Sequence, residues 1–403
     1  MVVPLGSTQP MFAFPVLEDI VDRPEDAPVD GLSLIEKKES GPLELPEIVF
    51  GGAAFSSFYN SEATIASDVP VRTVRLALQY NIRAFDTSPY YGVSEIVLGT
   101  ALKVLEPVFP RSSYKLMTKC GRYGLNQSEF DYSPETIRKS VERSLERFHT
   151  TYLDTVYLHD VEFVCTPVGP LEAGNPETTL FEKATEYGLA EGQEGQVWGE
   201  GDQKILDAYA ELRKMQEEGK IKHIGITAYT LSTLLRLALL VLHRPPYKPI
   251  DVLLSYCHLS LNNSTFATYA KPLRERAKVT QLLTASPLTM GLLTANPPSW
   301  HPAPAELKEA AKEANRIADD AQWPLGLVNL AAGYGFRKGE ENGMPVVVGL
   351  SNPREVHESI RAWREVKEGA DKAKRIALED QVIGAFGSTL GYSWASPPEE
   401  LRV

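Results

Sequence analysis

Short runs of β-branched and other apolar residues alternate with longer amphipathic segments along most of this 403-residue chain. Short apolar runs bounded by turn residues predict buried strands, and the amphipathic segments between them predict helices. Repeats of this kind without a glycine-rich phosphate fingerprint favour a closed (β/α)8 barrel of the TIM type over an open doubly wound sheet. The eight predicted strands span Glu47–Ala53, Ile82–Asp86, Lys115–Cys120, Asp154–His159, Lys222–Thr227, Asp251–Tyr256, Thr280–Ala285 and Pro345–Leu350.

Two segments depart from this rhythm. Residues 1–45 are rich in proline and acids and predict an extended arm over the surface, which leaves residues 46–403 for the barrel domain. Residues 161–202 follow the fourth strand and carry nine acids and one lysine among many glycines and prolines. An insertion there lies at the C-terminal face of a barrel, where it serves either as a lid over a site or as a solvated surface loop.

Composition narrows the classes of function. The apolar fraction of 43% supports a full core, and the net charge of −12 argues against nucleic acid or an anionic membrane as the main partner. Cys120, Cys165 and Cys257 form neither a metal pattern nor a paired framework, which fits a reducing compartment. The N-terminal residues lack the pattern of a secretory signal, and the longest apolar stretch is too short to span a bilayer. We therefore expect a cytoplasmic protein.

Polar residues mark the ends of three consecutive predicted strands. These are Asp86, Lys119 and His159, and Tyr91 follows Asp86 on the same loop. Each of the three strand-end residues also has an ordinary structural interpretation: Asp86 as a helix cap, Lys119 as a solvated cation and His159 as a structural hydrogen-bonding group. Because the ends of barrel strands converge on one mouth, their joint placement favours a shared chemical role.

Together these residues predict a proton-transfer device. A tyrosine of ordinary pKa is a poor base near neutrality, and we expect the Lys119 ammonium to lower the pKa of Tyr91. Asp86 would hold Lys119 charged and in place, and His159 would orient a substrate oxygen. This arrangement suits protonation or deprotonation of a carbonyl or alcohol oxygen while hydride moves at the carbon.

The stretch "FDTSPYYGVSEIVLG" resembles the signature of the aldo-keto reductase family, with Lys119 in "LMTKCG" and His159 in "VYLHD" at matching positions. "EEGKIKHIGIT", "ASPLTMGLLT" and "VVVGLSNPREVHESI" fall in the family's order, so that the resemblance covers residues 46–365. It implies a barrel that binds a nicotinamide dinucleotide and a catalytic tetrad of Asp86, Tyr91, Lys119 and His159. "YLHDVEFV" and "LLSYCHLSLNN" are most similar to the sugar-dehydrogenase branch.

The resemblance also implies where the cofactor lies. Three positions depart from the family pattern: Ala285 replaces a tyrosine that stacks on the nicotinamide, Leu254 replaces a glutamine, and Thr227–Ala228 replaces Ser-Asn. The implied cofactor contacts are Gly52, Ala53, Asp86, Thr227, Ser286, Leu288, Gly291, Gly349, Ser351 and Glu355.

Two of these positions bear on the choice of cofactor. Family members that prefer NADPH often carry a lysine where this chain has Gly349 and an arginine where it has Glu355. A carboxylate repels a 2′-phosphate and accepts from a ribose hydroxyl, which predicts NAD over NADP. Two alternatives stay open: Glu355 favours the first turn of its helix, and the adjacent Arg354 is within reach of a phosphate.

These expectations combine into an NAD-dependent oxidation of an aldose at C1 to a lactone, with D-arabinose or L-galactose as leading substrates. Tyr91 and His159 would contact the sugar, and Trp394 would stack on its face or else pack on the barrel. One rival is an NADPH-dependent aldehyde or ketone reductase using the same tetrad. The other is a nicotinamide-sensing regulatory subunit, for which the acidic insertion offers a docking surface.

Overall fold

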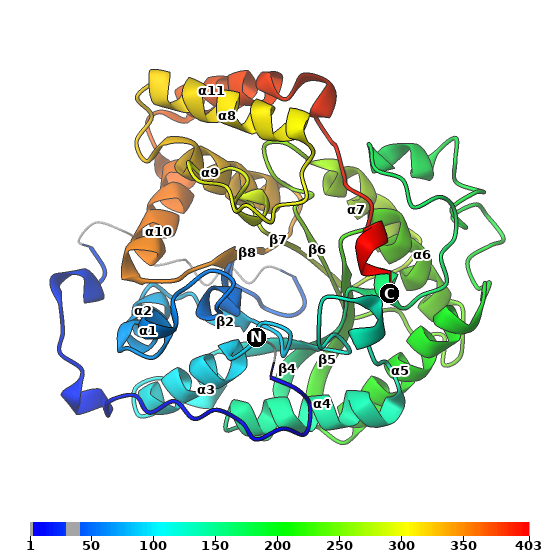
Figure 1. The fold of residues 1–403 in the computed structure, drawn as a ribbon, viewed down its shortest axis with the longest axis horizontal. Coiled ribbons are helices and arrows are strands. Elements are labelled where there is room, and N and C mark those ends of the chain that lie inside the picture. Colours follow the sequence, from blue (N-terminus) through cyan, green and yellow to red (C-terminus); the bar gives the residue numbers. More distant parts are fainter. Residues whose placement is uncertain (1–2, 30–40, 403) are drawn as a thin grey trace.

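Eight parallel strands close into a barrel in the computed structural model, which describes residues 3–29 and 41–402 (Figure 1). Neighbours along the chain pair with one another, and the last strand pairs with the first. All eight strands predicted from the sequence are confirmed. Their bounds are β1 Ile48–Gly51, β2 Ala84–Asp86, β3 Lys115–Cys120, β4 Leu153–His159, β5 Ile221–Ala228, β6 Val252–Tyr256, β7 Gln281–Ala285 and β8 Val346–Gly349.

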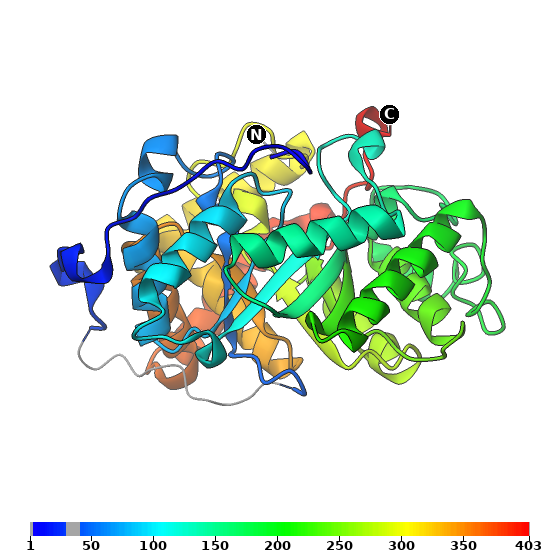
Figure 2. The same ribbon diagram turned by 90° about the horizontal axis from the view of Figure 1, so that it is seen from below.

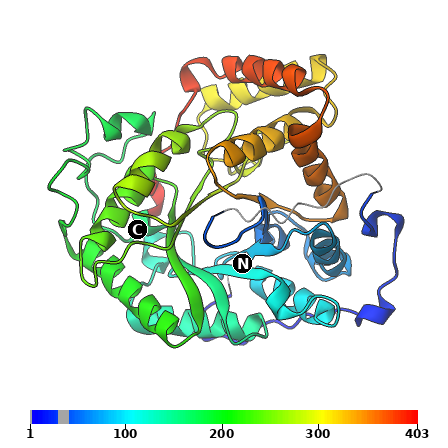
Figure 3. The ribbon, with the colours of Figure 1, turned by 180° about the vertical axis from the view of Figure 1, so that it is seen from behind.

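Helices surround the strands as a ring, seen from opposite sides in Figures 1 and 3. Nearly all strand residues are buried because helices cover the outside and side chains fill the inside, which explains their continuous apolar runs. The helices span α1 Glu62–Ile65, α2 Val69–Gln79, α3 Ser94–Leu105, α4 Pro134–Arg147, α5 Glu200–Glu217, α6 Leu231–Leu242, α7 Thr265–Glu275, α8 Ala305–Asp320, α9 Gly326–Glu341, α10 Pro353–Glu368 and α11 Lys372–Ala385.

Helices α8 and α11 are additions to the strand–helix repeat. They lie side by side at the edge of the ring, outside α9 (Figure 1). Alanines along α8 pack with Leu378 and Val382 of α11 in an apolar cluster separate from the main core. The chain then runs back from α11 across the C-terminal end of the barrel, which brings residues 393–396 to the loops that follow β4 and β5.

The described part of the arm follows the outer surface past α3 and α4 (Figure 2). The buried Asp26 pairs with Arg72 of α2 at 2.7 Å and fixes the arm there. Leu43 and Leu45, at its end, belong to the apolar cluster inside the barrel together with Val49. None of the helices in the described part of the chain combines the length and hydropathy that a bilayer span requires.

Candidate active site

Asp86 and Lys119 form a buried ion pair at the C-terminal ends of β2 and β3. The Lys119 Nζ donates to Asp86 Oδ1 at 2.6 Å and to the carbonyl oxygen of Thr87 at 2.9 Å. The second carboxylate oxygen of Asp86 is buried and has no hydrogen-bond partner among the described residues. Strands β2 and β3 are parallel neighbours, and Lys119 lies two residues beyond Met117, the register partner of Asp86, so that its side chain reaches back to the end of β2.

Tyr91 lies over this ion pair, on the loop between β2 and α3. The Lys119 Nζ is 5.0 Å from the centre of the Tyr91 ring. The His159 ring, at the end of β4, approaches the same phenol edge-on, with ring centres 5.7 Å apart and planes at 85°. The structure therefore brings the four residues predicted as a tetrad together at one mouth.

His159 is fixed on two sides. Its Nδ1 hydrogen-bonds Ser88 Oγ at 2.9 Å, and its backbone carbonyl accepts from the Tyr132 hydroxyl at 2.6 Å. Burial, followed by the positive charges of Lys119 and Arg122, lowers the pKa of His159 well below its ordinary value. The imidazole is therefore neutral near pH 7 and serves as a hydrogen-bonding group.

The sequence predicted a lowered pKa for Tyr91, and this prediction is wrong for the protein without a bound cofactor. Burial raises the pKa of Tyr91 well above its ordinary value, and the carboxylates of Asp86 and Asp160 raise it further. Lys119 does not offset this, because its charge is matched by Asp86 at 2.6 Å and the phenol faces a nearly neutral pair.

Tyr90 also lies beside His159, with ring centres 5.8 Å apart. It differs from Tyr91 in its cation: the Arg122 guanidinium carbon is 3.7 Å from the centre of the Tyr90 ring. Arg122 in turn pairs with Asp160, the residue after His159. Sequence reasoning did not single out Arg122 or Asp160, although Asp160 directly follows β4 and Arg122 lies two residues after β3.

Most of the predicted cofactor residues lie in a continuous arc of loops, because β8 pairs with both β7 and β1. Gly349 ends β8 and is exposed, and a Cβ there would meet nothing closer than the Ala54 Cβ at 4.0 Å. This open backbone beside the N-terminus of α10 fits a dinucleotide phosphate. Members of the arc are Gly52 and Ala53 after β1, Ser286, Leu288 and Gly291 after β7, and Gly349, Ser351 and Glu355 from β8 into α10.

Two predicted cofactor residues lie outside this arc. Asp86 is engaged by Lys119, and Thr227 of β5 is buried beside His159 in the register of β4 and β5. Leu254, which replaces the family's glutamine, is packed inside the barrel. The predicted tetrad and Thr227 therefore lie on β2 to β5 and the loops that follow them, whereas most of the other predicted cofactor residues lie on the arc.

Glu355 closes the N-terminus of α10. Its Oε2 accepts from the backbone N–H of Ser351 at 2.7 Å and its Oε1 from Asn352 Nδ2 at 2.9 Å, while Asn352 Oδ1 accepts from the Glu355 N–H at 3.1 Å. The carboxylate thus stabilises the helix end whether or not it contacts a ribose. Arg354 is exposed and lies 3.5 Å from Glu358.

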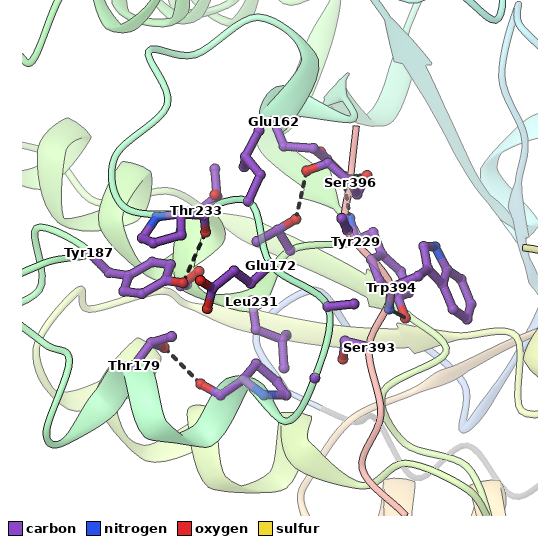
Figure 4. A pocket seen from close by; sticks show the side chains of 18 of the residues that line it. Glu162, Glu172, Thr179, Tyr187, Tyr229, Leu231, Thr233, Ser393, Trp394 and Ser396 are labelled. Carbon is purple, nitrogen blue, oxygen red and sulfur yellow. Dashed lines mark hydrogen bonds between the residues drawn. The ribbon is translucent and has the colours of Figure 1, made fainter. Parts of the chain in front are cut away.

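The insertion, the start of α6 and the C-terminal segment enclose a cavity of about 250 Å³ (Figure 4). Trp394 stacks on Tyr229 in its wall, with ring centres 4.2 Å apart and planes at 13°. The insertion is fixed to the C-terminal segment by paired backbone hydrogen bonds between Gly174 and Ser393. None of the tetrad residues, all within the described part of the chain, lines this cavity.

Glu162 of the insertion lines this cavity and also lies close enough to Asp160 to feel its charge. Its Oε1 accepts from the backbone N–H of Tyr229 and from Ser396 Oγ, both at 2.9 Å, and its Oε2 has no described partner. Burial, with the nearby charge of Asp160, raises the pKa of Glu162 to about 8. Among residues 3–29 and 41–402, no group of three His, Cys, Asp or Glu side chains could hold a metal ion.

Comparison with known proteins finds relatives over most of the chain. Residues 47–377 match the model of the aldo/keto reductase family. An L-galactose dehydrogenase of Arabidopsis thaliana is 36% identical over 81% of this chain and 86% of its own length. A D-arabinose 1-dehydrogenase of Saccharomyces cerevisiae is 34% identical over 82% of this chain and 88% of its own length.

Solved structures support the fold. An aldo-keto reductase from Bacillus halodurans superposes with a TM-score of 0.55 at 18% identity, over 89% of this chain and 96% of its own. A glycerol dehydrogenase from Gluconobacter oxydans gives 0.54 at 17% identity, over 84% and 92%.

Proposed function

Because this chain belongs to the aldo/keto reductase family, we propose that it oxidises an aldose at C1 to the lactone with NAD. The observation that carries the proposal is the Asp86–Lys119 ion pair beneath Tyr91, with a neutral His159 at the edge of the same phenol. Sugar oxidation is supported by the two relatives named L-galactose and D-arabinose dehydrogenase, which match most of this chain.

Each tetrad residue has a role in this reaction. Tyr91 takes the proton of the anomeric hydroxyl while the hydrogen on C1 leaves as hydride, and the resulting C1=O bond makes the lactone. His159 orients the reacting oxygen as a neutral hydrogen-bonding group, and Asp86 fixes Lys119 under the phenol. A bound oxidised nicotinamide supplies the hydride acceptor and a positive charge that favours the phenolate.

The cofactor would lie along the arc of loops from β7 through β8 to β1. Gly349 leaves room for the backbone to approach a phosphate, and the N-terminus of α10 lies beside it. The Glu355 carboxylate fills the place where a 2′-phosphate would need positive charge, and for this reason we propose NAD over NADP.

The test mixes the purified protein with NAD or NADP and a panel of aldoses, follows formation of the reduced cofactor and identifies the product. We expect NAD-linked oxidation, with D-arabinose, L-galactose or L-fucose among the best substrates and a lactone as product. Activity on simple aldehydes with NADPH alone would replace the proposal with the reductase. Cofactor binding without turnover on either panel would replace it with the regulatory subunit.

Oxidation should accelerate with rising pH. Because the pKa of Tyr91 is raised, its base form is scarce near neutrality and increases about tenfold per pH unit until that pKa is reached. His159 adds no acidic limb near its usual pKa, because burial keeps it neutral. We expect log kcat/KM for the aldose to rise with a slope near one from about pH 6 to pH 9. A plateau starting near neutrality would contradict a raised pKa for Tyr91 in the complex with NAD.

A further inference from the structure

Arg122 and Asp160 form a second buried ion pair at the mouth, next to the tetrad. Arg122 Nη1 pairs with Asp160 Oδ2, and their side chains are 11% and 2% exposed. The same Asp160 oxygen lies 3.6 Å from His159 Nε2. This ion pair therefore borders the place where the reacting oxygen of a substrate would lie.

Aromatic rings hold the guanidinium rigidly. Its carbon lies 3.7 Å from the centre of the Tyr90 ring, and the stacked rings of Phe130 and Phe163 lie 5.3 and 5.4 Å away. Arg122 Nε donates to the carbonyl oxygen of Gly124 at 3.0 Å, and Nη1 serves Asp160. Within the described residues no hydrogen bond uses Nη2, which leaves a fixed donor at the mouth.

Asp160 supplies the matching acceptor. Its backbone is left-handed, at φ 53°, directly after His159 at the end of β4. Its Oδ1 is buried and has no hydrogen-bond partner among the described residues. A buried carboxylate oxygen without a partner is costly, so that a donor from a ligand would satisfy it.

We propose that Asp160 and Arg122 bind the sugar hydroxyl on the carbon next to the one oxidised, with Asp160 Oδ1 accepting from it and Arg122 Nη2 donating to it. The inference rests on the proposed function and extends it to a specificity-determining pair. A hydroxyl is both donor and acceptor, and therefore satisfies both groups at once. Asp160 directly follows His159, and its carboxylate lies 3.6 Å from His159 Nε2 through Oδ2, so that these neighbouring side chains suit oxygens on adjacent carbons.

The pair predicts strong selection for a 2-hydroxy aldose. A sugar without that hydroxyl would leave a carboxylate oxygen and a guanidinium N–H unpaired in a buried place. Sites built to bind a substrate hydroxyl reject analogues that lack it by large factors. We expect kcat/KM for the 2-deoxy sugar to be lower by about 100-fold or more.

The experiment compares the best aldose of the panel with its 2-deoxy analogue, for example D-arabinose with 2-deoxy-D-ribose. Asp160→Asn should lower the ratio of kcat/KM for the aldose to kcat/KM for the 2-deoxy sugar by about the discrimination factor. The lost charge also acts on Tyr91, but that effect is common to both sugars and cancels in the ratio. Arg122→Lys keeps the charge but loses the planar fork, and it should reduce the same discrimination. This variant serves as the test if Asp160→Asn fails to fold. Glu162→Gln is the matched control, because it is a carboxylate-to-amide change in the same loop. It should preserve the discrimination between the aldose and its 2-deoxy analogue.

A binding measurement separates this inference from the proposed function. Calorimetric titration of the Tyr91→Phe protein with its cofactor reports sugar binding without turnover, with and without Asp160→Asn. If no aldose is oxidised but Asp160→Asn still weakens aldose binding, the proposed function is wrong and the pair stands. If aldoses are oxidised and Asp160→Asn affects both sugars equally, the pair is wrong and the function stands. If sugars are neither oxidised nor bound, both are overturned.

Discussion

Tyr91→Phe should lower kcat for aldose oxidation by about 10²- to 10⁴-fold, the usual contribution of a positioned acid–base group. The reason is that Phe cannot take the proton of the anomeric hydroxyl, although it fills the same space beside Lys119 and His159. Binding of NADH should change little, because the phenol acts on the proton and not on the dinucleotide. The measurement is kcat with saturating NAD, with cofactor affinity followed by fluorescence of the reduced nicotinamide.

Tyr90→Phe is the matched control for this substitution. Both tyrosines lie edge-on to His159 at nearly the same distance, so that proximity to the histidine does not distinguish them. Their cations do: Lys119, held by Asp86, faces Tyr91, whereas Arg122, held by Asp160, faces Tyr90. We expect Tyr90→Phe to cost much less than Tyr91→Phe. Comparable losses from the two variants would mean that the base has been assigned to the wrong tyrosine.

The barrel could be predicted because its strands are buried on both faces and therefore read as continuous apolar runs. The ends of individual strands differ from the predicted bounds. The first predicted strand, Glu47–Ala53, ends in the structure at Gly51, where the chain turns into a short 3₁₀ helix from Gly52. The second, predicted from Ile82, is paired only over Ala84–Asp86. In both strands the apolar run in the sequence extends beyond the residues that pair with a neighbouring strand. The run therefore does not mark the limits of the paired segment.

The tetrad could be predicted because Asp86, Lys119 and His159 lie at the C-terminal ends of three consecutive strands, which are neighbours in the barrel. The ion pair of Arg122 and Asp160 was beyond sequence reasoning, because it joins two loops and depends on the left-handed backbone at Asp160. The raised pKa of Tyr91 was missed for a similar reason. Its sign depends on burial and on how completely Asp86 engages Lys119, and spacing along the chain carries neither.

The double substitution Gly349→Lys with Glu355→Arg should move cofactor preference from NAD toward NADP. A 2′-phosphate gains about 1–3 kcal/mol from each good charge-assisted contact, or about 5- to 150-fold in kcat/KM per contact. The structure leaves room for the lysine, because Gly349 is exposed and its added Cβ would only touch Ala54 at 4.0 Å. Kinetics with each cofactor at a saturating aldose give the ratio of kcat/KM for NAD and NADP.

Glu355 calls for a control because its carboxylate also caps α10 through Ser351 and Asn352. Glu355→Gln keeps an oxygen acceptor at that place and removes the negative charge, so that its effect measures repulsion of the phosphate alone. We expect a smaller shift toward NADP than in the double variant, with little loss of thermal stability, since the amide still accepts from the helix end. The preference for NADP over NAD should therefore increase from the unmodified protein to Glu355→Gln and again to the double variant. An unmodified protein that already prefers NADP would overturn this reading of both positions and direct attention to Arg354, whose exposed guanidinium lies one residue away.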